Sequence, residues 1–362
     1  MTEGDAPQRR SRFWLLAPFV VLVLLFAGWS ITWFVIRERT GAGIDAWMAR
    51  EAAHGRVWDC PGRTIGGYPF RIEVSCPQIT LTHGDEHVSA AGLSSVTQVY
   101  QPRHTILEIA GPLRVSDGRV TLDGSWKSLQ ASVRSDSAGL QAAALVIDAP
   151  NFRLAGLTPS EATASARSFE AHLRPDPARA VSDAVYDVAA STAQAAIPLL
   201  DGVLGGPEPI DAELRLAVTQ AREPGARTPA DELERWRAAG GRVEIAALSL
   251  AKGTRRLEAK GELMLDELHR PAGRLDVAAA GLSDLLATLT GGRIGGAGGG
   301  LLGGIAGSLL GGGKPRNPPP AAGEAQAGTK PALAPLPPIL IQNGKVALGP
   351  FPLPGVRLGP LY

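Results

Sequence analysis

The stretch FRIEV at residues 70–74 decides the fold, because apolar and charged side chains alternate along it. Successive side chains of a strand point to opposite faces, so this pattern predicts a strand with one apolar and one wet face. Strand-like runs, several with the same period of two, recur at 79–82, 96–100, 106–109, 120–123, 129–133 and 140–147. Glycine or proline separates many of these runs at spacings of roughly 8–12 residues, which indicates an antiparallel meander.

Further along the chain, the alternation resumes and is interrupted by helical segments. It returns at 211–218, 242–245 and 257–266. A helix is predicted over 228–239, because Thr228 suits the N-cap position and a proline suits the first helical position. Alanine-rich residues 182–200 and the short segment 282–289 also predict helices. The fold class is therefore mainly β (α+β), a curved antiparallel sheet with a few packing helices.

A glycine- and proline-rich segment lies near the C-terminus. Residues 291–313 contain 13 glycines, and residues 314–338 contain eight prolines. Such composition cannot bury enough surface to offset the entropy of ordering, so 291–338 is predicted to be a mobile insertion. Strand character returns around the tight turn Asn343-Gly344. Residues 339–362 are therefore predicted to form a hairpin that rejoins the sheet.

Phe13 to Ile36 is a run of 24 residues without a charge, directly after a short basic leader at 1–12. A helix of this length reaches about 36 Å, enough to cross a hydrocarbon core of about 30 Å. The run therefore predicts a transmembrane helix over 13–36. Tryptophans near both ends suit the lipid interfaces, namely Trp14, Trp29 and Trp33. A separate amphipathic helix is predicted over 41–56.

Two other interpretations of this segment fit less well. A cleaved signal peptide has an apolar core of about 7–15 residues, and this run is longer and followed by charges. A lipoprotein needs a cysteine just after the apolar stretch, where this chain has none. Arginines near the helix ends set the orientation: three precede it and two follow it. A cytoplasmic leader, a single-pass inner-membrane anchor and a periplasmic β domain over 41–290 are expected if the cell has two membranes.

The chain has only two cysteines, Cys60 and Cys76, and both follow the anchor closely. An even count in an exported domain favours a disulfide over two unrelated thiols. The loop between them is short, so a bridge would contribute about 3 kcal/mol.

The sequence offers no convincing chemical site. The net charge of +1 arises from 36 basic and 35 acidic residues, so no nucleic-acid partner is expected. His83 to His87 holds two imidazoles and two carboxylates, but a polar hairpin turn explains the cluster better than a metal does. The glycine fingerprint at 298–303 lacks a flanking strand and helix. No catalytic residue, metal ligand or cofactor site is predicted, and the protein is expected not to be an enzyme.

A family resemblance rests on particular residues. A short helix ending at Trp58-Asp59-Cys60, then GGYPFRI at 66–72, Cys76-Pro77 and NGKVALGP at 343–350, resembles the DUF2125 family of proteobacterial envelope proteins. The pattern of successive strands is also similar to that of AsmA-like envelope proteins. That second resemblance is architectural, and it implies a curved sheet anchored to the inner membrane with an apolar concave face that handles lipid.

Strands with one apolar face, tethered to a bilayer, are suited to binding acyl chains, because each methylene group that leaves water contributes about 0.8 kcal/mol of favourable free energy. We therefore expect a protein that binds or shields lipid, with the bilayer, a lipid ligand and unidentified envelope proteins as partners. An assembly scaffold whose apolar face is simply its core is the alternative, and an unseen hydrolase is weaker still. If the apolar face of the sheet is an open trough, the residues expected to line it are Ile106, Val120, Leu122, Leu214, Leu216, Val243 and Ile245.

Overall fold

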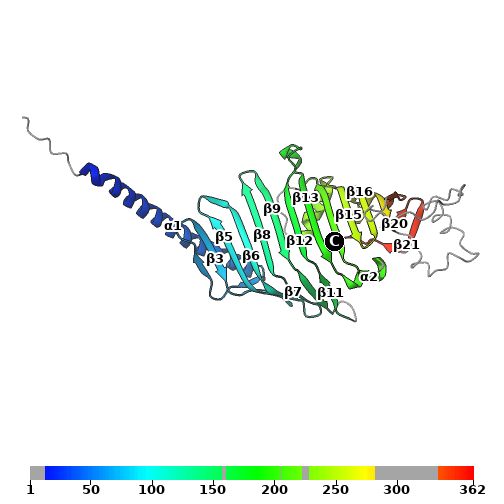
Figure 1. Cartoon of the computed structure of the whole chain (residues 1–362), viewed down its shortest axis with the longest axis horizontal. Coiled ribbons are helices and arrows are strands. Elements are labelled where there is room, and N and C mark those ends of the chain that lie inside the picture. Colours follow the sequence, from blue (N-terminus) through cyan, green and yellow to red (C-terminus); the bar gives the residue numbers. More distant parts are fainter. Residues whose placement is uncertain (1–12, 157–159, 205, 222–227, 282–332) are drawn as a thin grey trace, which may run out of the picture.

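The computed structural model describes residues 13–156, 160–204, 206–221, 228–281 and 333–362 (Figure 1). The predicted leader, the predicted helix over 282–289, the glycine fingerprint and most of the predicted insertion lie outside these residues. The side chains of residues 13–15, including Trp14, also lie outside the description.

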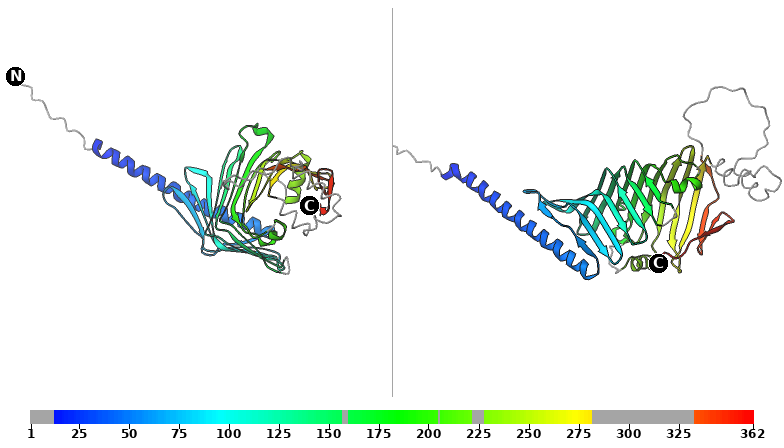
Figure 2. Two further views of the ribbon diagram at one scale, coloured as in Figure 1. Left: turned by 45° about the vertical axis from the view of Figure 1, so that its right-hand side comes forward. Right: turned by 90° about the horizontal axis from the view of Figure 1, so that it is seen from below.

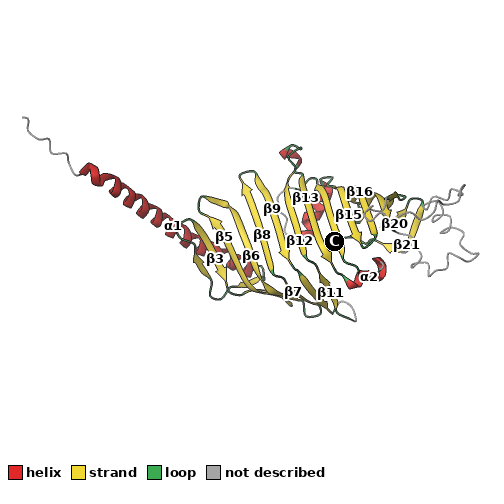
Figure 3. Ribbon diagram, in the orientation of Figure 1, coloured by secondary structure: helices red, strands yellow, loops and turns green. Residues whose placement is uncertain are grey.

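One antiparallel sheet forms most of the described molecule, and it is curved and not closed (Figures 2 and 3). Its first strands are β1 Val57–Asp59, β2 Thr64–Gly66, β3 Arg71–Cys76, β4 Ile79–His83, β5 Glu86–Gln98, β6 Gln101–Ser116, β7 Thr121–Ser125, β8 Ser128–Asp136, β9 Gly139–Asp148, β10 Asn151–Ala155 and β11 Ala162–Ser165. The later strands are β12 Ser168–Pro175, β13 Tyr186–Ala195, β14 Ile210–Val218, β15 Val243–Lys252, β16 Arg255–Leu265, β17 Pro271–Ala280, β18 Ala334–Pro335, β19 Ile339–Gln342, β20 Lys345–Leu348 and β21 Phe351–Arg357.

The strand pairings give a long meander with a side ribbon. Along the main series, each strand pairs with the next in the order β3, β5, β6, β8, β9, β12, β13, β14, β15, β16, β17, β19, β20 and β21. The far end of β6 pairs with β7 instead, and β7 leads on to β10 and β11. The predicted antiparallel meander is confirmed.

Helix α1 spans Phe13–Ala53 without a break. The sequence predicted two helices, over 13–36 and 41–56, and that division is wrong. The helix continues through residues 37–43 because this segment packs against β2: Arg37 Nε donates to Ile65 O at 2.9 Å, and a Cβ on Gly41 would lie 3.4 Å from Ile65 Cδ1. Figure 2 shows α1 lying against the first end of the sheet and projecting beyond it.

The remaining helices are short. They are α2 Pro198–Leu204, α3 Pro229–Ala238 and the 3-10 turn Val181–Asp183. Helix α3 has the predicted cap, since Thr228 Oγ1 accepts from the backbone N–H of Asp231. The predicted helix over 182–200 is wrong for most of its length, because residues 186–195 form β13 between β12 and β14. Backbone pairing on both sides outweighs the helical preference of alanine there.

The C-terminal strands join the same sheet. β19 pairs with β17, and Asn343-Gly344 forms the turn to β20, both residues with positive φ. Residues 333–338, counted in the predicted insertion, are already attached, since β18 pairs with β17 and Leu336 N donates to Val277 O. Strand β21 ends the series and contains prolines at positions 352 and 354.

Candidate functional site

The clearest candidate site is the apolar face of the sheet, and β13 to β15 show how it is built. Alternate side chains of neighbouring strands meet in register on this face: Val188 pairs with Leu216, and Leu216 pairs with Ile245. Leu214 pairs in the same way with Leu248. Four of the predicted trough residues therefore share this face, since Val218 also pairs with Val243: Leu214, Leu216, Val243 and Ile245.

The same face continues through the middle of the sheet. In β9, Leu145 lies between Ala131 of β8 and Ala171 of β12. One row further along β12, Leu173 lies between Ala143 and Val188. The apolar rows therefore run without a break from β8 to β15.

The other predicted trough residues lie elsewhere. Leu122 is on the side ribbon, where it pairs with Val115 and Leu154, and Val120 directly precedes that strand. Ile106 is 45 % exposed and lies on the opposite face of β6, in register with Ser132. Its neighbour Leu107, which pairs with Ala131, occupies the apolar face instead.

The middle of this face is poorly covered. Among all residues of β8, β9, β12 and β13, only Ile147 and Ala195 are buried. Val133 of β8 remains 38 % exposed. Within the described parts of the chain, the helices make their main contacts elsewhere: α1 with β1 and β2, and α2 with β11. A closed two-layer core would bury many more of these side chains.

Helix α3 covers the far end of the face and leaves an apolar pocket there. Leu233 and Trp236 of α3 line it with Val218, Val243 and Leu263 of the sheet. The pocket has a volume of about 390 Å³. A hydrogen bond to the backbone holds the Trp236 ring in place: its Nε1 donates to Thr219 O at 2.7 Å.

A charged cluster ties α3 to the C-terminus beside this pocket. Glu234 accepts from the Arg237 guanidinium at 2.6 Å and from the Tyr362 hydroxyl at 2.9 Å. These two hydrogen bonds hold the pKa of Glu234 at about 2, well below its usual 4.5. Burial raises the pKa of the Tyr362 hydroxyl. The Tyr362 ring stacks on His269, with ring centres 4.4 Å apart.

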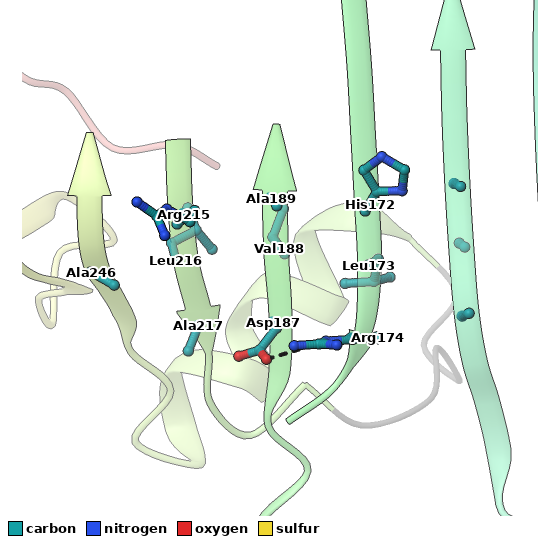
Figure 4. Close-up of a pocket in the computed structure, with 13 residues that line it drawn as sticks. His172, Leu173, Arg174, Asp187, Val188, Ala189, Arg215, Leu216, Ala217 and Ala246 are labelled. Atoms are coloured by element: carbon teal, nitrogen blue, oxygen red, sulfur yellow. Dashed lines mark ion pairs between the residues drawn. The ribbon is translucent and has the colours of Figure 1, made fainter. Parts of the chain in front are cut away.

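The opposite face carries both charged and short apolar side chains, and it has a shallow hollow of about 580 Å³. Short side chains such as Ala189 and Ala217 form its floor, and longer charged ones rise at its sides (Figure 4). Arg174 and Asp187 form an ion pair across it at 3.6 Å. Alternation of short and charged residues on this wet face accounts for the hollow.

The cysteines are joined, as predicted. The Cα atoms of Cys60 and Cys76 lie 5.5 Å apart, a normal separation for a disulfide. The bridge ties the end of β1 to the end of β3.

The histidine cluster forms a turn. Residues 84–85 join β4 to β5, and His83 lies 3.4 Å from Glu86 on an exposed surface. No group of three or more metal-ligand side chains occurs among the described residues.

Comparison with known proteins identifies the family. The family described as an uncharacterized protein conserved in bacteria, DUF2125, matches residues 33–356. The chain belongs to the DUF2125 family. No curated protein matches the chain, and no solved structure matches it. The resemblance to AsmA-like proteins therefore stays a prediction.

The GGYPFRI segment of this DUF2125 protein, residues 66–72, forms part of the contact with α1. Trp33, expected at a lipid interface, is only 4 % exposed, and its Nε1 donates to Arg71 O at 2.9 Å. Trp29 Nε1 donates to Pro69 O at 2.9 Å. Both sides of this contact stand out in the sequence, but their packing against each other could not be predicted from it.

Proposed function

We propose that this protein is a non-enzymatic, single-pass inner-membrane protein whose periplasmic sheet binds or shields lipid on its apolar face. One observation carries the proposal: the apolar rows of β8, β9, β12 and β13 are continuous, yet most of their side chains are only half-buried. Such a surface, larger than scattered apolar residues, is typical of a binding site. We call the continuous apolar face of β8 to β15 the trough.

The dimensions of the trough suit an acyl chain. Strands lie about 4.8 Å apart, so the five spacings from β8 to β15 measure about 24 Å. One leaflet of a bilayer contributes about 15 Å of hydrocarbon, half of a core of about 30 Å. An acyl chain can therefore lie across these strands, with each methylene gaining about 0.8 kcal/mol.

The anchor supports the location. Helix α1 is long and apolar enough to cross a membrane. In the proposed orientation the leader is cytoplasmic, because arginines favour that side. A disulfide suits an oxidising compartment such as the periplasm. An alkaline phosphatase fusion after Tyr362 should be active, and a cytoplasmic reporter at the same place should be silent. The reverse pattern would overturn the orientation.

The test of the trough uses the full chain, because truncation within α1 would strip away the buried Trp33. The protein is reconstituted in vesicles of phosphatidylethanolamine and phosphatidylglycerol that contain a phospholipid with a photoreactive acyl chain. Peptide mapping after illumination should find lipid on the apolar face of β9 to β15, at positions such as Leu145, Leu173 and Leu216. Lipid confined to α1 would overturn the proposal.

A matched pair of substitutions sharpens the test. Leu216→Asp places a carboxylate in the trough, and Ala217→Asp places one on the opposite face next to it. In an open trough water reaches the charge, so Leu216→Asp should lose lipid labelling on β13 to β15 while its melting temperature stays within a few degrees. Ala217→Asp should keep the labelling. If Leu216→Asp unfolds the protein, the face is a dry core, and the scaffold alternative is favoured.

A further inference from the structure

The loop between β2 and β3, residues 67–70, lies against α1 inside the predicted membrane-spanning stretch. The Tyr68 ring packs against Phe26, Trp33 and Phe34, with ring centres 6.4, 5.3 and 6.2 Å apart. Its hydroxyl lies 2.8 Å from Ser30 Oγ. Tyr68 is therefore level with the turn of α1 around Ser30.

The charges around the apolar run fix how deep that level is. The run begins after Arg12 and ends before Arg37. A hydrocarbon core of about 30 Å takes about 20 residues of helix, so its outer boundary falls between about residues 32 and 36. Ser30 then lies about 3 to 9 Å inside that boundary. Wherever the helix settles within its apolar run, Tyr68 reaches the acyl region.

The surface beside Tyr68 has the character of a membrane contact. Phe70 is 60 % exposed, and Tyr100, on the turn between β5 and β6, is 62 % exposed. The two lie on adjacent turns, since Val99 N donates to Phe70 O at 3.0 Å. Exposed aromatic residues clustered next to a spanning helix are typical of the lipid interface.

Most carbonyl groups of the loop have hydrogen-bond partners within the protein. Pro69 O and Arg71 O accept from the indoles of Trp29 and Trp33. Phe70 O accepts from Val99 N, and Gly67 O accepts from Arg71 N at 3.1 Å. Pro69 has no N–H to satisfy. Lipid cannot pair with backbone groups, so a loop that enters it must have partners within the protein.

We propose that Tyr68, Pro69 and Phe70, with Tyr100 beside them, insert into the periplasmic leaflet next to α1 as a second membrane contact. The inference rests on the proposed anchor and orientation, but not on the trough. It makes the attachment rigid, because the first strands of the sheet are held at the bilayer surface instead of hanging from a flexible stalk.

The experiment places p-benzoylphenylalanine, one position at a time, in the full chain reconstituted in phosphatidylethanolamine and phosphatidylglycerol vesicles. Position 70 tests the loop, and position 100 tests the adjacent turn independently. Position 19, exposed in the apolar run of α1, reports on the anchor. Position 351, exposed on β21 at the far end of the sheet, is the matched control.

Illumination should attach phospholipid at positions 19, 70 and 100, and intact-mass measurement should find none at 351. Labelling at 19 with neither 70 nor 100 above 351 would overturn the inserted loop and leave the anchor standing. No labelling at 19 would overturn the anchor and the loop together.

A charge variant gives a second readout. Phe70→Asp puts a carboxylate where hydrocarbon is expected, so labelling from position 100 should fall about tenfold, while labelling from position 19 stays unchanged. Phe351→Asp should change neither. Undiminished labelling at position 100 in Phe70→Asp would contradict insertion of the loop.

Discussion

Helices α1 and α3 pack against two separate regions of the sheet, here called the first end and the far end, and each donates an indole N–H to a backbone carbonyl. At the first end, Trp33 of α1 donates its indole N–H to Arg71 O. At the far end, Trp236 of α3 donates its indole N–H to Thr219 O. An indole offers a large apolar ring and one donor, so it can cover a sheet and satisfy a backbone carbonyl together.

The difference between the ends lies in what reinforces each indole. The first end has a disulfide and a cluster of aromatic rings, and it lies beside the helix that is long and apolar enough to cross a membrane. The far end has the ion pair of Glu234 and Arg237 and the C-terminal tyrosine. Covalent and buried apolar contacts are less sensitive to solvent than exposed ion pairs. The first end should therefore be the stable one, and the far end the adjustable one.

The largest expected effect is at Trp33. Because this ring is almost completely buried, Trp33→Ala should lower the free energy of unfolding by about 3–5 kcal/mol. Urea unfolding of the full chain in detergent micelles measures it. Trp33→Phe, which keeps a ring and loses the donor, should cost about 1 kcal/mol. A loss below about 1 kcal/mol for Trp33→Ala would show that the first end is not held by this ring.

The disulfide should come next. Cys60→Ser should lower the free energy of unfolding by about 2–4 kcal/mol, because the unfolded chain gains freedom when the loop opens. The double substitution Cys60→Ser, Cys76→Ser should match the single one, since both remove one bridge. Thiol labelling of the denatured, unreduced natural chain should find no free cysteine. Two labelled thiols would contradict the bridge.

A smaller effect is expected at the far end. Trp236→Phe should cost about 1 kcal/mol, because it removes the donor to Thr219 O and keeps most of the ring. Unfolding in urea, compared directly with Trp33→Phe, measures whether the two indoles are equivalent. A much larger loss at Trp236 would break the comparison, since it would make the far end the stable one.

The smallest effect is a dependence on pH. The pKa of Glu234 is about 2 in the folded protein and near 4.5 without its partners. Its contribution to stability is therefore complete above pH 4.5 and is lost as the pH falls toward 2. Melting temperatures of the natural chain and of Glu234→Gln should converge over this range. Curves that stay parallel would contradict the assigned role. The carboxylate is partly exposed, so the change should be modest.

The sequence predicted the sheet better than it predicted the helices. Alternation reports which face of a strand is apolar, and Leu214, Leu216, Val243 and Ile245 share one face of β14 and β15. Alternation did not identify the face of Ile106, because apolar residues occupy consecutive positions there. Only the pairing of Leu107 with Ala131 shows that Leu107, and not Ile106, lies on the apolar face.

The helical predictions failed where contacts distant in sequence decide the structure. Arg37 to Gly43 reads as a break, yet the contacts with Ile65 keep α1 continuous. The alanine-rich residues 186–195 form a strand because neighbours on both sides pair with them. The openness of the trough could not be predicted, since alternation is the same for a covered and an uncovered face.

Strand β21 affects how these molecules behave when they are crowded together. An open sheet ends in a row of backbone donors and acceptors to which a second chain can add. Prolines at 352 and 354 remove two of those donors from the last strand of the series. Growth of one sheet into the next, the first step of aggregation, is therefore opposed at this edge by the absence of N–H groups.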